Sequence, residues 1–240
     1  MFLDIFTQPE TWIALVTLTF LEIVLGIDNI IFISLVTGKL PKEKQPKARL
    51  IGLSLAIIFR IGLLVGISYI IHFTDPILSY HDYHLSGRDL ILLGGGLFLL
   101  AKSTSEIHEK INQHADEKAE KEKATPNFWS TIVQIILLDI VFSFDSILTA
   151  IGLTEHIIIM IIAVVLAMLV MMTFAGIISD FIHKHPTFQI LALSFLILIG
   201  TMLIAEAFHY HVPKGYIYFA VAYSLVVELI NMRIRNKRNI

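Results

Sequence analysis

The 240-residue chain contains no cysteine, and Asp, Glu, Lys and Arg together make up only 16% of it. Without cysteine there is no disulfide, thiolate metal site or cysteine nucleophile, so any metal ligands must be oxygen or nitrogen atoms. A soluble domain is about a quarter charged. Because 56% of the residues are hydrophobic, the composition is typical of a protein whose surroundings are largely lipid.

Other absences narrow the function classes. The formal net charge of -2 gives no general affinity for nucleic acid. No GxxxxGK[ST] sequence is present, which argues against ATP hydrolysis, and no HExxH motif or nucleophile–base arrangement indicates an enzyme. No Lys or Arg precedes the first apolar run and no small-residue cleavage site follows it, so we expect no removable signal peptide.

Long apolar runs dominate what is present. A membrane-spanning helix needs roughly 20 mostly apolar residues, and seven stretches meet this requirement. The sequence therefore predicts an all-α polytopic membrane protein embedded in the lipid bilayer. The predicted spans are Trp12–Val36, Ala48–His72, Asp89–Ile107, Phe128–Gly152, Ile157–Ser179, Thr187–Ala207 and Gly215–Met232.

The positions of the basic residues predict the orientation, because cytoplasmic loops retain Lys and Arg. With the N-terminus outside and the C-terminus in the cytoplasm, only Arg88 and Lys214 of the 18 basic residues fall outside, and Arg60 lies within a span. We therefore expect a multi-pass membrane protein in this orientation. The charged segment Lys102–Pro126 is expected to be a solvated, helical cytoplasmic connector.

The sequence contains an internal repeat. Sliding it by 117 positions aligns FLEIVLGIDNIIF, from Phe20, with LLDIVFSFDSILT, from Leu137. A weaker match places Glu106 of the third span on Glu206 of the sixth. Two units of three spans have opposite orientations in the membrane, the inverted-repeat plan of many secondary transporters. We expect a first repeat at residues 1–107, a charged loop at 108–126, a second repeat at 127–212 and a seventh helix with a basic tail at 213–240.

Four carboxyl groups lie inside the first and fourth spans. Insertion scales assign roughly 2.5–3.5 kcal/mol to an acid near a helix centre, so such residues persist where they face a cavity, a partner or an ion. A packing role, as buried pairs or protonated acids, is the alternative. The repeat aligns Glu22 with Asp139 and Asp28 with Asp145, and we expect the four acids to form a polar site.

Helix geometry limits how these acids can meet. Residues six apart on a straight helix diverge by roughly 120°, so we expect a bend or unwound turn at Gly26, and a second one at Ser143, to bring the acids to one cavity. The repeat also aligns Asn29 with Ser146. Their oxygens suit a hard cation such as manganese, magnesium or calcium, although both residues are equally suited to helix–helix hydrogen bonding.

Three further residues, Arg60, Glu106 and Glu206, are secondary candidates. Arg60 is either a structural counter-ion or an occupant that exchanges with the cation, and the former is the simpler role. Glu106 and Glu206 lie near span ends and are ranked as vestibule or interface residues. The three glycines Gly94, Gly95 and Gly96 are expected to permit close helix packing.

The two acidic motifs, together with RLIGLSLAIIFR, FLLAKSTSEIHEK and the HPTFQ…PKGYIYFA region, resemble the TerC family of bacterial integral membrane proteins over nearly the whole chain. That family is named for tellurium resistance, is grouped with LysE-like transporters and is implicated in manganese efflux. The resemblance implies manganese export with the ion held by Glu22, Asp28, Asp139 and Asp145. An acidic cluster repels oxyanions, so direct tellurite transport is disfavoured.

The leading hypothesis is a divalent-cation exporter that works by alternating access with proton antiport. Carboxylates made basic by burial can hold protons and release them when a cation arrives. The substrates are then the metal ion and protons, with no resident cofactor. The alternative is a membrane scaffold that does not transport and acts in stress resistance through partners, which the sequence leaves unidentified.

Overall fold

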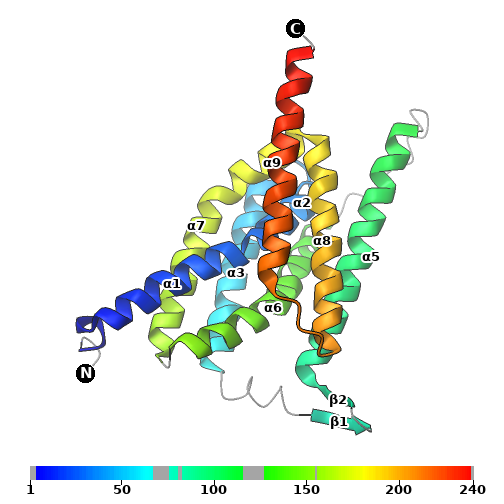
Figure 1. The fold of residues 1–240 in the computed structure, drawn as a ribbon. Coiled ribbons are helices and arrows are strands. Elements are labelled where there is room, and N and C mark those ends of the chain that lie inside the picture. The colour runs from blue at the N-terminus through cyan, green and yellow to red at the C-terminus, as the bar shows by residue number, and fades with distance from the viewer. Residues whose placement is uncertain (1–3, 67–75, 81–82, 116–126, 155, 239–240) are drawn as a thin grey trace. The chain divides into compact units, whose positions relative to one another are not determined.

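A computed structural model describes residues 4–66, 76–80, 83–115, 127–154 and 156–238. A short 3-10 helix, η1 (Asp4–Thr7), precedes α1 (Pro9–Leu25), α2 (Ile27–Thr37) and α3 (Gln45–Val65). A β-hairpin follows, and then come the long helices α5 (Gly87–Ala115), α6 (Phe128–Leu153), α7 (Ile157–Lys184), α8 (Pro186–Ala207) and α9 (Lys214–Arg238). Figure 1 shows these elements along the chain.

Seven helical segments of the described chain are long and apolar enough to cross a membrane, so the predicted all-α polytopic fold is confirmed. The first of them, Pro9–Thr37, is two helices, because α1 ends at Leu25, Gly26 interrupts the helix, and α2 begins at Ile27. Proline occupies the first turn of α1, α3 and α8, where its fixed φ suits a helix start and its missing N–H costs no bond. The side chain of Asn127 caps α6 by accepting from the backbone N–H of Trp129 at 3.1 Å.

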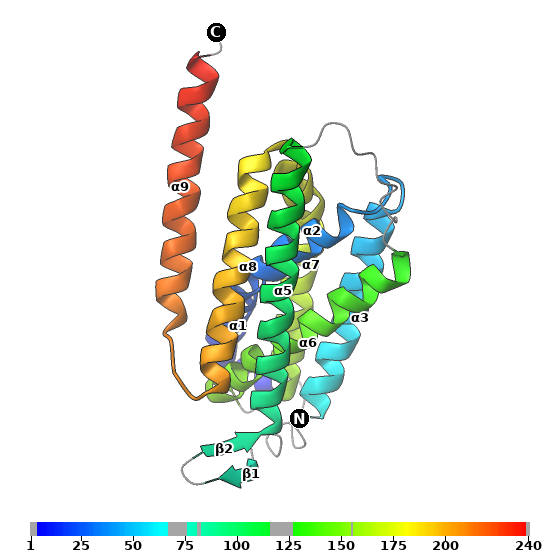
Figure 2. The same ribbon diagram turned by 90° about the vertical axis from the view of Figure 1, so that its right-hand side faces the viewer.

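The second predicted span, Ala48–His72, can be compared with the structure only in part. Helix α3 ends at Val65, and residues 67–75 lie outside the described part of the chain. The antiparallel hairpin between β1 (Pro76–Tyr80) and β2 (Tyr83–Ser86) was not predicted from the sequence. Figure 2 shows how β2 leads directly into α5.

The chain divides into two compact units, each built from segments far apart in the sequence. Unit 1 takes in residues 1–88 and 124–181, and unit 2 takes in residues 89–123 and 182–240. In unit 1, α6 contacts α1, α2 and α3. About half of the membrane-spanning part of α6 is buried, so this helix forms the centre of unit 1.

The face of α3 that contacts α6 carries small residues at every fourth position. Ala48, Gly52 and Ala56 are buried on this face, followed by Arg60 and Leu64. A Cβ atom added to Gly52 would lie 2.9 Å from Cδ1 of Ile135 on α6. The small side chains therefore let the two helix backbones approach closely, and this approach carries Arg60 to the middle of α6.

In unit 2, α5 and α8 run side by side (Figures 1 and 2). Gly96 and Gly200 form their closest approach: an added Cβ on Gly96 would lie 2.7 Å from the carbonyl oxygen of Gly200. This contact confirms the expected close packing for Gly96, whereas an added Cβ on Gly94 would meet nothing within 4 Å. At one end of this helix pair, Nε2 of His209 lies 3.1 Å from Oδ2 of the buried Asp89.

Candidate cation site

Arg60 joins two acids from different helices in the buried centre of unit 1. Its Nη1 donates to Oε2 of Glu22 on α1 at 2.5 Å. Its Nη2 and Nε donate to Oδ1 and Oδ2 of Asp139 on α6 at 2.9 and 3.3 Å. All three side chains are at most 5% exposed. The guanidinium therefore holds Asp139 through both of its oxygens, the geometry in which arginine binds carboxylate most specifically.

Two neutral side chains complete the hydrogen bonding of Asp139. The amide of Asn29 on α2 donates to Oδ1 of Asp139 at 3.2 Å. The hydroxyl of Ser143 lies 3.3 Å from Oδ2 and 2.5 Å from the backbone oxygen of the same residue. We call these five residues, Glu22, Asn29, Arg60, Asp139 and Ser143, the Arg60 cluster. Each polar group in a buried network of this kind needs its partners.

The local sequence explains how four helices bring these groups together. Ile132, Ile135, Asp139 and Ser143 recur on α6 at intervals of three or four residues and are all buried, so they share one face. Arg60 stands four residues after Ala56 on the buried face of α3. Glu22 lies in the last turn of α1, one turn before the interruption at Gly26.

The interruption at Gly26 confirms one predicted bend. Its backbone N–H donates to the carbonyl of Ile23 at 3.2 Å, a bond three residues back, where an α-helix bonds four residues back. The predicted bend at Ser143 is wrong, since α6 is a continuous helix from Phe128 to Leu153. The Ser143 hydroxyl bonds to the carbonyl of Asp139 within the same helical turn, and α6 continues through it without interruption.

Asn29 and Ser146, aligned by the repeat, have different partners. Asn29 bonds across to α6 through Asp139. Ser146 donates to the backbone oxygen of Ser143 at 3.2 Å within α6. Both side chains are buried, and the helix–helix role that the sequence left open is the one that Asn29 adopts here.

The structure describes the other two predicted acids to different extents. Asp28 is half-buried in the first turn of α2. The backbone of Asp145 belongs to α6, but its side chain lies outside the described residues. Among the described residues, no group of three or more His, Asp or Glu side chains is placed to hold a metal ion.

Glu106 and Glu206 belong to unit 2. Glu106 lies 3.1 Å from Nζ of Lys102, four residues earlier on α5. Glu206 is buried near the end of α8. Lys102, which interrupts the third predicted span, is thus paired within its own helix.

Sequence reasoning missed Ser143 as a partner of Asp139 and the small-residue face of α3 that delivers Arg60. Both have a periodic signal: Ser143 follows Asp139 by four residues, and Ala48, Gly52, Ala56 and Arg60 are each four residues apart. A search for small residues at every fourth position would have marked this face of α3 as a helix contact.

Comparison with known proteins places the chain in a family. A model of the family described as "Integral membrane protein TerC family" matches residues 7–239. The chain is 52% identical to the UPF0053 inner membrane protein YgdQ of Escherichia coli K12, over 97% of each chain. It is 51% identical to a UPF0053 protein of Haemophilus influenzae, over 95% of this chain and 96% of that protein.

A longer relative shares the same region. The chain is 45% identical to the UPF0053 inner membrane protein YoaE of Escherichia coli K12, over 95% of this chain and 44% of that protein. No solved structure matches the chain. The match along almost the whole length, together with the seven membrane-spanning helices, shows that the chain is an integral membrane protein belonging to the TerC family.

Proposed function

We propose that this protein exports divalent metal cations, manganese in particular, from bacterial cells by alternating access in exchange for protons. The observation that carries the proposal is the Arg60 cluster. Its two acids, Glu22 and Asp139, are partners in the sequence repeat and converge on one buried cationic group. Manganese as the substrate follows from the family resemblance, and the carboxylate oxygens suit it.

The guanidinium of Arg60 occupies the place between the two carboxylates that a cation would take. Arginine stays protonated under all relevant conditions, so the group leaves only by moving and not by losing a proton. A divalent ion that replaced it would bring twice the charge to the same oxygens. In this proposal Arg60 pairs with both acids whenever the carrier holds no divalent ion, and it takes the exchanging role that the sequence left as one of two alternatives.

Asp28 and Asp145 are the proposed second pair of ligands. The interruption at Gly26 lets α2 take a different direction from α1. Asp28 therefore need not point about 120° away from Glu22, as it would on one straight helix. A half-buried carboxylate at this position is accessible to an incoming ion while Glu22 is held by Arg60. We propose that the ion meets Asp28 first and then displaces Arg60.

Proton exchange supplies the energy. Moving a divalent cation outward against an inside-negative potential costs about 4.6 kcal/mol per 100 mV, twice the single-charge value. Two protons moving inward for each divalent ion would cancel this charge movement. These protons would be carried by the carboxyl groups that Arg60 does not neutralise, since desolvation favours their neutral form, and they would be released when the divalent ion binds.

Flux through proteoliposomes tests the proposal. In proteoliposomes with manganese on one side of the membrane, the purified protein should move the metal across and move protons in the opposite direction. A metal-sensitive dye and a pH-sensitive dye measure the two fluxes. Asp28→Asn, which leaves the partners of Arg60 in place, should lower the metal flux by at least about tenfold, corresponding to roughly 1.4 kcal/mol of lost cation binding. Glu22→Gln and Asp139→Asn should do the same.

The matched control is Glu10→Gln, because Glu10 is an exposed acid in the first turn of α1. It should transport as the unaltered protein does, and size-exclusion profiles should show that all variants are folded. Metal movement without proton movement would remove the antiport step. A folded wild-type protein that moves no divalent ion would favour the scaffold hypothesis and overturn the proposal.

A further inference from the structure

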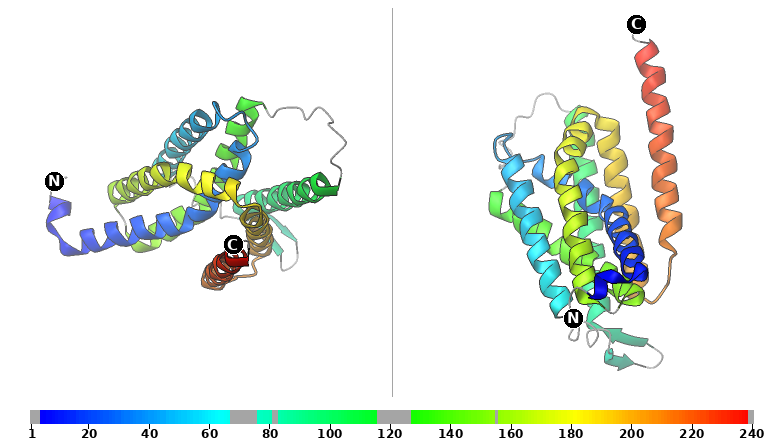
Figure 3. Two further views of the ribbon diagram at one scale, coloured as in Figure 1. Left: turned by 90° about the horizontal axis from the view of Figure 1, so that it is seen from above. Right: turned by 90° about the vertical axis from the view of Figure 1, so that its left-hand side faces the viewer.

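A groove lies between α3 and α7 at one end of unit 1, away from the residues of the Arg60 cluster. Its volume is about 450 Å³, within the range of small-molecule sites. Figure 3 shows α3 and α7 side by side in both views, and the lining residues pair the start of α3 with the end of α7. We call it the α3–α7 groove.

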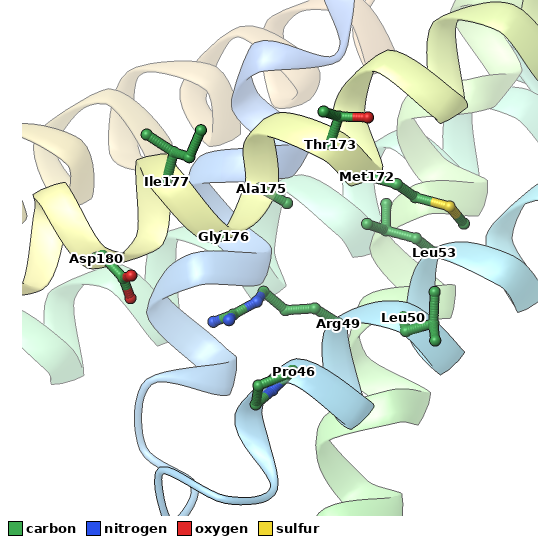
Figure 4. Close-up of a pocket in the computed structure, with 10 residues that line it drawn as sticks. All are labelled: Pro46, Arg49, Leu50, Leu53, Met172, Thr173, Ala175, Gly176, Ile177 and Asp180. Atoms are coloured by element: carbon green, nitrogen blue, oxygen red, sulfur yellow. The ribbon is translucent and has the colours of Figure 1, made fainter.

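One cationic and one anionic side chain mark the mouth of the groove. Arg49 is half-buried one turn into α3, and Asp180 is exposed one turn before the end of α7. Figure 4 shows the guanidinium and the carboxylate as separate groups at the same end of the groove. Arg49 donates from Nη1 to the hydroxyl of the buried Ser179 at 3.1 Å, a bond that orients the guanidinium without using up its donors.

The wall of the groove becomes apolar away from these charges. Leu50 and Ile177, which lie beside the charged residues, are 59% and 64% exposed. Leu53 and Met172 line the groove one to two helical turns deeper. Because both helices are long and apolar enough to span a membrane, we expect these apolar side chains to face acyl chains and the charged pair to lie at the level of the lipid headgroups.

We propose that the α3–α7 groove binds a phospholipid whose headgroup carries a primary ammonium beside its phosphate, as in phosphatidylethanolamine. The guanidinium of Arg49 would take the phosphate, the carboxylate of Asp180 would accept from the ammonium, and the acyl chains would run past Leu50, Leu53 and Ile177. A free cation is disfavoured because Arg49 repels it, and an anionic lipid is disfavoured because Asp180 repels it.

Competition between lipids in native mass spectrometry tests this site on the full-length protein. The delipidated protein is given equal amounts of phosphatidylethanolamine, phosphatidylglycerol and phosphatidylcholine with identical acyl chains. Phosphatidylethanolamine should be retained in preference to the other two. Phosphatidylglycerol lacks the positive charge, and the quaternary ammonium of phosphatidylcholine cannot donate a hydrogen bond to Asp180.

Variants separate the two contacts. Arg49→Gln should weaken retention of all three lipids by about tenfold. Asp180→Asn should abolish the preference for phosphatidylethanolamine while leaving the phosphate contact. Lys47→Gln and Glu43→Gln are matched controls, because these exposed residues lie at the same end of α3 without lining the groove, and both should bind as the unaltered protein does.

Two further arms keep the result decisive. Glycerophosphoethanolamine and inorganic phosphate, which lack acyl chains, should not displace the lipid at matched concentration; displacement would assign the site to a soluble phosphate compound. If Arg49→Gln fails to fold, Arg49→Lys replaces it, since it keeps the charge and removes the planar fork. Equal retention of the three lipids by the unaltered protein, or an unchanged preference in Asp180→Asn, would overturn the proposal. The site is independent of any transport activity.

Discussion

Arg60 supplies the positive charge that pairs with both acids of a buried centre. A buried ion pair contributes little net stability, because desolvation of both partners offsets their attraction. Removing one partner is far more costly, since the charge left behind is buried and uncompensated. The contacts to both oxygens of Asp139 and to Glu22 therefore make the cluster depend on Arg60 in particular.

Arg60→Met should destabilise the protein by about 3–5 kcal/mol, the cost of breaking a buried pair. It should also make stability depend on metal, because a divalent ion could then supply the missing positive charge, and a ligand that binds only the folded state stabilises it. Thermal unfolding with and without manganese measures both effects. Manganese should raise the Tm of Arg60→Met more than that of the unaltered protein.

Two comparisons make this prediction specific. Arg60→Lys keeps the charge but cannot hold both oxygens of Asp139. Its stability and its manganese-induced shift in Tm should therefore lie between those of Arg60→Met and the unaltered protein. Lys47→Met removes an exposed charge at the start of the same helix and should change the free energy of unfolding by at most about 0.5 kcal/mol. Equal manganese-induced shifts in Arg60→Met and the unaltered protein would contradict the exchange role of Arg60.

Part of the Arg60 cluster was predictable from the sequence. Glu22 and Asp139 stand out because acids are costly in apolar spans and because the repeat aligns them. The role of Arg60 stayed open, since hydropathy gives its depth but not the face of α3 on which it lies. Ser143 was missed because a serine in a membrane helix carries no cost that sets it apart.

The break between α1 and α2 depends on a glycine in contact with another helix. A Cβ atom on Gly26 would lie 2.4 Å from Sδ of Met171 on α7 and 2.9 Å from the carbonyl oxygen of Glu22. The first atom belongs to a flexible side chain that can move. The second belongs to the backbone of a residue in the Arg60 cluster, so any displacement there is transmitted to that cluster.

Gly26→Ala should therefore destabilise the protein by about 1–3 kcal/mol, the usual cost of overpacking, and should lower metal flux. In a Met171→Ala background, where the space for the new methyl group is already open, Gly26→Ala should cost less than it does in the unaltered protein. Gly62→Ala is the control, since a Cβ at that position on α3 meets nothing within 4 Å, and it should be neutral or stabilising by up to about 1 kcal/mol. Chemical or thermal unfolding in detergent measures all three.

The contact between α5 and α8 should tolerate an added methyl group less well, because the backbones of the two helices lie against each other at Gly96 and Gly200. Gly96→Ala would place a methyl group 2.7 Å from the carbonyl oxygen of Gly200, which moves only if the helices separate. We expect a loss of at least about 1–3 kcal/mol with no rescue from trimming neighbouring side chains. Gly94→Ala, two residues earlier on α5, meets nothing within 4 Å; equal unfolding curves for these two variants would refute the close contact.

Among the secondary-structure elements, hydropathy predicted the membrane-spanning helices and did not predict the β-hairpin. All seven spans were identified, because each must satisfy its backbone hydrogen bonds inside an apolar layer. The hairpin Pro76–Tyr80 and Tyr83–Ser86 was missed, since two short strands carry no such requirement. Helix α5 continues beyond the predicted end of the third span at Ile107 and reaches Ala115. This first part of the expected helical connector is therefore helical, and residues 116–126 lie outside the described part of the chain.

The molecule as a whole is organised by two asymmetries, one in charge and one in sequence. Basic residues gather on one predicted side of the membrane, and the repeat predicts that α1 and α6 enter the membrane from opposite sides. Each compact unit also combines helices from both predicted repeats, α1, α3, α6 and α7 in unit 1 and α5 and α8 in unit 2. The repeat predicts only the relative orientation of the two units, and the basic residues predict which side is cytoplasmic.

Because the chain has no cysteine, single cysteines can report this orientation without background. A membrane-impermeant maleimide should label His156→Cys, between α6 and α7, and His211→Cys, between α8 and α9, in intact cells. It should label Lys42→Cys, between α2 and α3, and Lys184→Cys, at the end of α7, only after the membrane is opened. Lys42 and His156 are separated by three predicted spans, an odd number, so they must differ in accessibility if the repeats are inverted. Labelling of both from one side would exclude the inverted repeat, whereas exchange of the two sides would keep the repeat and reverse the orientation that the basic residues predict.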